Sequence, residues 1–237
     1  MRDAFIDNRN TRDPPMVTAV MRMPGESVRS VPPVPWAGRG RWRPRPVTLV
    51  VLLLGLWLFG TGEALLVASH LGNTPWTVLA QGVSRHSPLS IGESTFAISV
   101  AVLLLWVPLR ERPGLGTVLN AVVIAVAIDV MLDWLPQPKA NPMRLAEVIA
   151  GIAAIGIGSA LYLTTQLGPG PRDGWMTGIA RRAHWPIASV RLGIEISVLV
   201  AGFFLGGRVG VGTVLFALTI GYAVAASIAA VAKLGAR

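Results

Sequence analysis

The chain contains an internal duplication, because residues 55–124 recur 96 positions later as residues 151–220. Aligned without a gap, the two stretches are identical at 23 of 70 positions. The matches include Gly72 with Gly168 and Pro75 with Pro171, and the longest run pairs residues 114–119 with 210–215. Glycines and prolines occupy set places in a fold, so we infer one structural unit used twice. The period is too long for solenoid or propeller units.

Six apolar stretches are long enough to cross a bilayer, which takes about 20 residues in a helix. They are residues 47–69, 90–109, 115–135, 145–167, 187–206 and 212–233. With 52% hydrophobic residues among 237, the sequence therefore predicts an all-α integral membrane protein with six transmembrane helices. We expect a first membrane repeat at 47–135 and a second at 143–234. Each repeat has an odd number of spans, so the second copy must enter the membrane from the opposite side, as in many transporters.

Two further apolar segments, residues 75–86 and 171–184, occupy equivalent positions in the repeats. As helices they would reach only about 20 Å, which is too short to span. Each is expected to be an interfacial or a re-entrant helix, and both alternatives stay open. The residues expected to form structural turns around these segments and the third spans are Gly72, Pro75, Gly168, Pro171, Gly116 and Gly212.

The first 46 residues carry nine arginines, four acidic residues and eight of the 18 prolines. Such a composition cannot bury enough apolar surface to fold, so we expect a disordered basic tail at 1–46. Basic residues flank the apolar stretches, and the positive-inside rule then places the N-terminus in the cytoplasm. The net charge of +9 is thereby explained as a topology signal, and no nucleic acid is expected as a partner.

Charged residues within apolar spans are the best candidates for function, because each costs about 2.5–3.5 kcal/mol at mid-helix on insertion scales. They are Glu63 in the first span and Arg191 with Glu195 in the fifth. The repeat equivalents of the latter two, Thr95 and Ser99, are also polar. One interpretation is a solute or ion path in which the carboxylates bind a cation or proton and Arg191 holds an anionic group. The alternative is a structural pair that joins helices, with Arg191 extending to the interface.

Asp173 completes the candidate path, since it follows the Gly-Pro-Gly-Pro turn at 168–171. An acidic residue near a helix start complements the helix dipole, which is the simpler explanation. A re-entrant turn at this place would instead offer backbone N–H groups to an anionic ligand. Asp129 and Asp133, four residues apart near the end of the third span, form either a cation entrance or a solvated helix end.

The glycine-rich motifs at 167–174 and 210–215, together with 71–76 and 113–117, resemble the YczE/YyaS/YitT family of bacterial integral membrane proteins. The resemblance covers residues 47–233 and implies a multi-pass protein of the bacterial cytoplasmic membrane. It implies no particular activity. The first unit of the family has Pro-Trp-Asp where this chain has Pro75-Trp76-Thr77. The family pattern would place one acidic residue in each short segment. This chain has only the acidic residue of the second segment, Asp173.

Motifs of enzymes are missing from the sequence, which has no phosphate-binding loop, His-Glu-x-x-His or Gly-x-Ser-x-Gly. We expect a protein that is not an enzyme and that needs no cofactor or metal. The duplication and the polar residues favour a permease or secondary transporter for a small solute. Expected partners are the lipid bilayer, a small-molecule or ion substrate and further copies of the chain. A membrane scaffold or accessory subunit without transport activity is the alternative, and an intramembrane enzyme is a third.

Overall fold

The structure is a computed structural model, and it describes residues 32, 34–136 and 138–235. These residues form helices and connecting turns, with no strand among them. In chain order the helices are α1 (Pro46–Ser69), α2 (Pro75–Arg85), α3 (Ile91–Leu104), α4 (Trp106–Leu109), α5 (Leu115–Trp134), α6 (Asn141–Thr164), α7 (Pro171–Ala183), α8 (Ile187–Phe204) and α9 (Val211–Gly235).

Six helical segments are long and apolar enough to cross a membrane: α1, α3 continued by α4, α5, α6, α8 and α9. The predicted all-α class and the six spans are thus confirmed. The fourth span begins at Asn141 rather than residue 145, because Pro142 supplies a fixed φ at the start of the helix. The second span is interrupted at Leu105. Pro108 has no N–H to offer the carbonyl group of Leu104, which ends the regular helix there.

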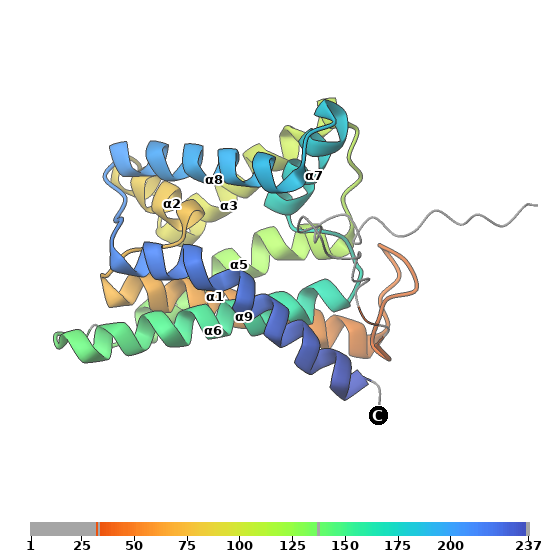
Figure 1. The fold of residues 1–237 in the computed structure, drawn as a ribbon, viewed down its shortest axis with the longest axis horizontal. Helices are drawn as coiled ribbons and strands as arrows, with labels where there is room; N and C mark the ends of the chain where they lie inside the picture. Colours follow the sequence, from red (N-terminus) through yellow and green to blue (C-terminus); the bar gives the residue numbers. More distant parts are fainter. Residues whose placement is uncertain (1–31, 33, 137, 236–237) are drawn as a thin grey trace, which may run out of the picture.

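The helices form two layers (Figure 1). In one layer α1 packs between α5 and α6, and α6 also contacts α9. The other layer contains α3 and α8 with the short helices α2 and α7. Both short helices begin with a proline at the first helical position, as the sequence predicts. Within α2 the first turn is capped by Thr74, whose hydroxyl oxygen accepts from the N–H of Thr77 at 3.3 Å.

Glycines let α1 and α6 cross at close range. A Cβ atom at Gly55 would lie 3.0 Å from the carbonyl oxygen of Gly158, and one at Gly62 would lie 2.6 Å from that of Gly151. The order of these contacts is reversed along the two helices, so α1 and α6 are antiparallel. Gly55 is equivalent to Gly151, and Gly62 is equivalent to Gly158. The two contacts are therefore equivalent to each other in the duplication. These glycines therefore allow the close packing of the two helices.

The turn of each repeat is held by the third span of the other repeat. The N–H of Gly212 donates to the carbonyl oxygen of Leu71 at 2.9 Å, and the N–H of Gly116 donates to that of Leu167 at 2.9 Å. Gly72 and Gly168, which follow these carbonyl groups, have φ values of 119° and 117°, a region that favours glycine. The predicted turn residues therefore form two matching joints between the repeats.

Each short helix packs against the end of a longer segment of the other repeat. Gly82 of α2 lies against Leu205 at the end of α8, and Gly178 of α7 lies against Leu109 at the end of α4. The connections at 110–114 and 205–210 lie at opposite ends of the helical bundle (Figure 1). The inverted arrangement of the two repeats in a membrane remains a prediction.

Residues 34–45, which were predicted to belong to a disordered tail, pack against the helices as a strap. The N–H of Gly38 donates to the carbonyl oxygen of Thr165 at 2.9 Å, and the indole N–H of Trp36 donates to the hydroxyl group of Thr164 at 3.2 Å. Val34 is buried against Ala160 of α6. A few apolar residues among the arginines and prolines are therefore enough to anchor this stretch. Residues 1–31 lie outside the described residues.

Candidate solute site

A cavity of about 150 Å³ lies where the two repeats meet. It is bounded by α1, α2 and α5 from the first repeat and by α6, α7, α8 and α9 from the second. Most of its lining comes from positions that are equivalent in the duplication. These pairs are Phe59 with Ile155, Glu63 with Ser159, Thr74 with Gly170, Trp76 with Arg172, Asn120 with Phe216, and Ile124 with Ile220.

Glu63 projects from α1 into this site, and its side chain is only 1% exposed. The hydroxyl groups of Thr77 and Thr74 donate to its Oε2 atom at 2.5 Å and 3.0 Å. Both threonines belong to the start of α2. The carboxylate thus ties the first span to the short helix of its own repeat, and hydrogen bonds satisfy it where water is scarce.

Arg172 lies opposite Glu63, with 3.9 Å between Nη1 of the arginine and Oε1 of the glutamate. Its guanidinium group also covers the ring of Trp76 at 5.3 Å from the ring centroid, a cation–π geometry. Arg172 was not among the candidate residues from the sequence, and the structure places it on the cavity. Its position directly after Pro171, equivalent to Trp76, is the signal that was available in the sequence.

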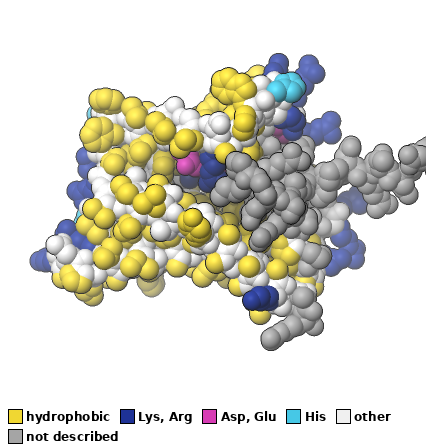
Figure 2. Space-filling model, viewed as in Figure 1, with side chains coloured by type: hydrophobic (Ala, Val, Ile, Leu, Met, Phe, Trp, Pro, Cys, Tyr) yellow, Lys and Arg dark blue, Asp and Glu magenta, His cyan; other side chains and the backbone are white. Residues whose placement is uncertain are grey.

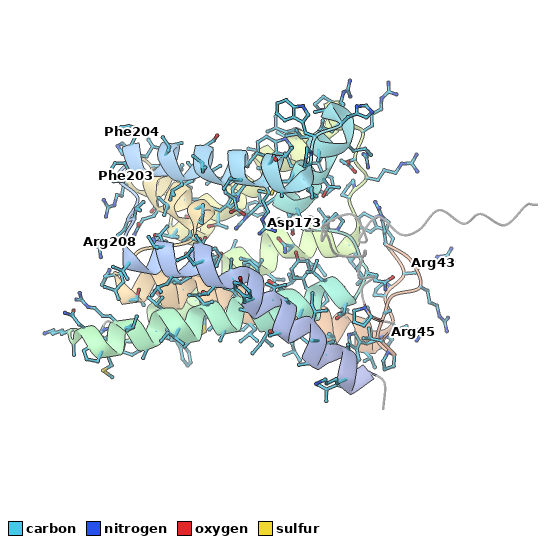
Figure 3. The ribbon with its side chains drawn as sticks, in the orientation of Figure 1. Arg43, Arg45, Asp173, Phe203, Phe204 and Arg208 are labelled. Carbon is cyan, nitrogen blue, oxygen red and sulfur yellow. The ribbon has the colours of Figure 1, made fainter. Side chains whose placement is uncertain are left out.

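Asp173 lies at the third position of α7 and accepts a hydrogen bond from the hydroxyl group of Tyr162 at 2.7 Å. Figure 3 shows Asp173 in the middle of the molecule, far from Arg43 and Arg45 at one end and Arg208 at the other. Two cavities share this residue, because Asp173 and Leu163 line both the central cavity and a neighbouring one. Asp173 therefore stands at the boundary between the two spaces.

The neighbouring cavity has a volume of about 270 Å³ and opens near the strap. Its charged lining comprises Arg39 and Arg41 of the strap, Glu111 and Arg112 of the α4–α5 connection, and Asp173. We call it the vestibule. Arg41 Nη1 donates to the carbonyl oxygen of Arg112 at 2.7 Å, which fixes the strap across this space. The vestibule extends the central cavity toward one end of the bundle.

Arg191 and Glu195 of α8 form an ion pair with 2.9 Å between Nε and Oε1, as their spacing predicts. Both line the central cavity. Their side chains are 49% and 30% exposed, which is unusual for charges in the middle of a span. The structure thus brings four predicted residues to one cavity: Glu63, Asp173, Arg191 and Glu195.

Thr95 and Ser99 are buried on α3 but do not line the cavity. The hydroxyl group of Thr95 instead donates to the carbonyl oxygen of Ile91 one turn earlier, at 2.8 Å. Asp129 caps the start of α3, whereas Asp133 is exposed at the end of α5. Among the described residues, no group of three or more His, Asp or Glu side chains is placed to hold a metal ion.

The fold and the site define a multi-pass membrane protein with a polar cavity between two repeats. The chain belongs to a family of unknown function (DUF6198), whose model matches residues 47–228. It is 48% identical over 196 residues to an uncharacterized protein of Haemophilus influenzae, covering 83% of this chain and 90% of the relative.

Two relatives from Bacillus subtilis bear out the resemblance that the sequence motifs indicate. The chain is 32% identical over 183 residues to the uncharacterized membrane protein YczE, covering 76% of this chain and 82% of the relative. It is 28% identical over 166 residues to the uncharacterized protein YyaS, covering 68% and 83%. No solved structure matches the chain.

Proposed function

We propose that this protein is a permease or secondary transporter for a small solute in the cytoplasmic membrane of a bacterium. The observation that carries the proposal is the central cavity, whose lining pairs equivalent residues of two antiparallel repeats. In transporters built this way, the site lies between the repeats, and the two repeats alternate in opening it to either side. The proposal includes no catalytic step, cofactor or metal.

The charged residues supply the chemistry of a coupled transporter. Glu63 and Arg172 connect α1 with α7 across the repeat boundary, so a change at either charge alters the contact between the repeats. Asp173 separates the central cavity from the vestibule, and its bond to Tyr162 joins α7 to α6. A cation that binds Asp173 would weaken that bond and favour movement of α7. Solute passage is thereby linked to the charge state of one carboxylate.

Reconstitution of the purified protein into liposomes tests the proposal. A panel of amino acids, sugars, organic acids and ammonium cations is screened first by thermal shift and then by uptake with and without a proton gradient. We expect uptake that Asp173→Asn lowers at least tenfold. Asp133→Asn, which changes an exposed carboxylate outside the site, serves as the matched control and keeps full uptake. Absence of binding and uptake across the panel, with both variants folded, would contradict the proposal.

The strap favours one second candidate, a membrane scaffold that binds an acidic partner. Arg39, Arg43 and Arg45 are exposed on it, and Figure 3 shows Arg43 and Arg45 at one end of the molecule. Deleting residues 1–31 leaves the strap in place, and replacing the three arginines with glutamine removes its exposed charge. Loss of the cellular phenotype in the strap variant, with no loss in Asp173→Asn, would favour the scaffold over the transporter.

A further inference from the structure

The two repeats differ where their second and third spans meet. In the first repeat α3 is fastened to α5 by Asp129. Its Oδ1 atom accepts from the N–H of Gly92 at 2.8 Å, and its Oδ2 atom accepts from the hydroxyl group of Ser90 at 2.6 Å. Gly92 also brings the backbone of α3 against the carbonyl oxygen of Ala125. We call these contacts the α3–α5 clasp.

The second repeat has no residues for an equivalent clasp. The positions that correspond to Asp129, Gly92 and Ser90 are Ala225, Ala188 and Pro186, which offer neither a carboxylate nor a hydroxyl group. Accordingly α8 and α9 barely touch, although they follow each other along the chain. Gly221 of α9, equivalent to Ala125, faces open space. A gap therefore separates α8 from α9 where their counterparts α3 and α5 are joined.

This gap leads into the central cavity. Arg191 and Glu195 of α8 and Phe216 and Ile220 of α9 line that cavity from the two sides of the gap. The most apolar windows of α8 and α9 are only 11% and 6% buried, against 50% in α1. In a bilayer these two helices therefore face lipid, and the gap between them opens sideways into hydrocarbon. Figure 2 shows acidic and basic side chains together in the middle of this face, with apolar side chains of described residues above and below them.

Charge at a lateral opening selects the kind of molecule that can use it. The ion pair of Arg191 and Glu195 is too exposed to be shielded by protein alone. Contact between charges and lipid tails is unfavourable. A molecule with one polar end and one apolar end satisfies both surfaces, because its polar end meets the charges and its apolar end meets α9 and lipid.

The charges that line the cavity also determine whether the polar end of this molecule should be positive or negative. Its lining holds three carboxylates and two guanidinium groups, so one carboxylate is in excess. Arg172 pairs with Glu63, and Arg191 pairs with Glu195 while also interacting electrostatically with Asp173. Asp173 is the remaining acid, and among the described residues it makes a hydrogen bond with Tyr162 rather than an ion pair. The rings of Phe59, Tyr162 and Phe216 line the same space, and aromatic faces attract organic cations.

We propose, building on the transport function above, that the solute is an amphiphilic organic cation that enters from the bilayer between α8 and α9. Its cationic end lies at Asp173 among the aromatic rings. Its apolar part lies along Phe216 and Ile220 and extends through the gap. The vestibule, whose lining carries Arg39, Arg41 and Arg112 as well as Glu111 and Asp173, is then the space next to the charged end.

Binding to the full chain in lipid nanodiscs tests the inference, with octyltrimethylammonium as the probe and empty nanodiscs as the blank. Octyl sulfate has the same tail with the opposite charge, and tetramethylammonium has the same charge without the tail. We expect the probe to bind at least tenfold more tightly than either comparison compound. Asp173→Asn should weaken binding of the probe at least tenfold, and Asp133→Asn should leave it unchanged.

A second pair of variants tests the route. Gly221→Phe fills the gap, whereas Leu218→Phe alters a position of α9 that is 67% exposed. We expect Gly221→Phe to slow uptake of the probe into liposomes at least tenfold and Leu218→Phe to leave it unchanged. Thermal unfolding shows whether each variant is folded. If Asp173→Asn does not fold, the comparison of the three compounds on the unaltered chain decides the question.

The following results would overturn the inference. Octyl sulfate binding as tightly as the probe would refute the assigned charge. Unchanged uptake by a folded Gly221→Phe variant would refute the lateral route, as would efficient disulfide crosslinking of Gly221→Cys between two copies. Uptake of a hydrophilic solute without binding of the probe would overturn this inference and leave the transport function standing. Failure of every solute, hydrophilic or amphiphilic, would contradict both.

Discussion

At the scale of single residues, Glu63 and Arg172 offer the most direct test of the site. Glu63→Gln keeps one oxygen that can accept from Thr74 and Thr77 but leaves Arg172 without its counter-charge. Removing one member of a buried pair is costly, and coupling between contacting residues is about 0.5–3 kcal/mol. We therefore expect each of Glu63→Gln and Arg172→Gln to lower the free energy of unfolding, and the double variant to lose less than their sum. Unfolding in detergent measures the coupling, and strictly additive losses would show that the pair does not interact.

Gly72 supports a second prediction about single residues. Its φ of 119° strains any side chain, and a Cβ atom there would lie 2.5 Å from the backbone nitrogen of Gly210. Gly72→Ala is expected to lower the free energy of unfolding by about 1–3 kcal/mol. In contrast, Gly193 lies in α8 with open space around it, so Gly193→Ala should be neutral or stabilising by up to about 1 kcal/mol. Equal effects of the two substitutions on the unfolding midpoint would contradict the close approach at Gly72.

Some residues of the site could be predicted from the sequence because charged residues are rare in apolar spans. Glu63, Arg191 and Glu195 stand out for this reason, and all three line the cavity. Arg172 was missed because an arginine beside a proline turn looks like a topology signal. Thr95 was included because it is equivalent to Arg191, yet the asymmetry of the repeats places α3 away from the cavity.

At the scale of helices, the α3–α5 clasp predicts a local change in stability. Asp129→Ala removes the acceptor for both Ser90 and Gly92, whereas Asp133→Ala removes an exposed carboxylate from the same helix. Hydrogen bonds to charged groups contribute about 1.5–3 kcal/mol. We expect faster amide hydrogen exchange in the first turns of α3 for Asp129→Ala and no change for Asp133→Ala. Unchanged exchange at residues 91–95 in a folded Asp129→Ala variant would show that α5 does not hold α3.

Helix boundaries followed closely from the sequence because prolines and glycines mark most of them. Pro75 and Pro171 each occupy the first position of a helix, as expected, and α1 begins at Pro46, one residue before the predicted start. The start of α6 was predicted four residues late because Arg144 interrupts the apolar pattern. The gap between α8 and α9 was not predictable, since both helices read as ordinary apolar spans. Only the comparison with the α3–α5 clasp reveals what the second repeat lacks.

At the scale of the whole molecule, the antiparallel repeats predict the sides on which two connections lie. The chain has no cysteine, so single cysteines can be introduced and labelled without background. Pro113→Cys and Val209→Cys occupy equivalent, exposed positions in the two repeats. We expect a membrane-impermeant maleimide added outside cells to label Val209→Cys alone, and both variants to react after the membrane is opened. Labelling of both from outside would refute the inverted arrangement.

The joints at Gly72 and Gly168 bear on how such a chain arose. Each turn is completed by a backbone N–H from the other repeat. One repeat alone would therefore lack the donor for its own turn. An ancestral gene encoding one copy could build the same joints only as a pair of identical subunits facing in opposite directions. Its product would have had to insert into the membrane both ways. Fusion of two copies, followed by an unequal distribution of arginines, would then have fixed one direction for each half.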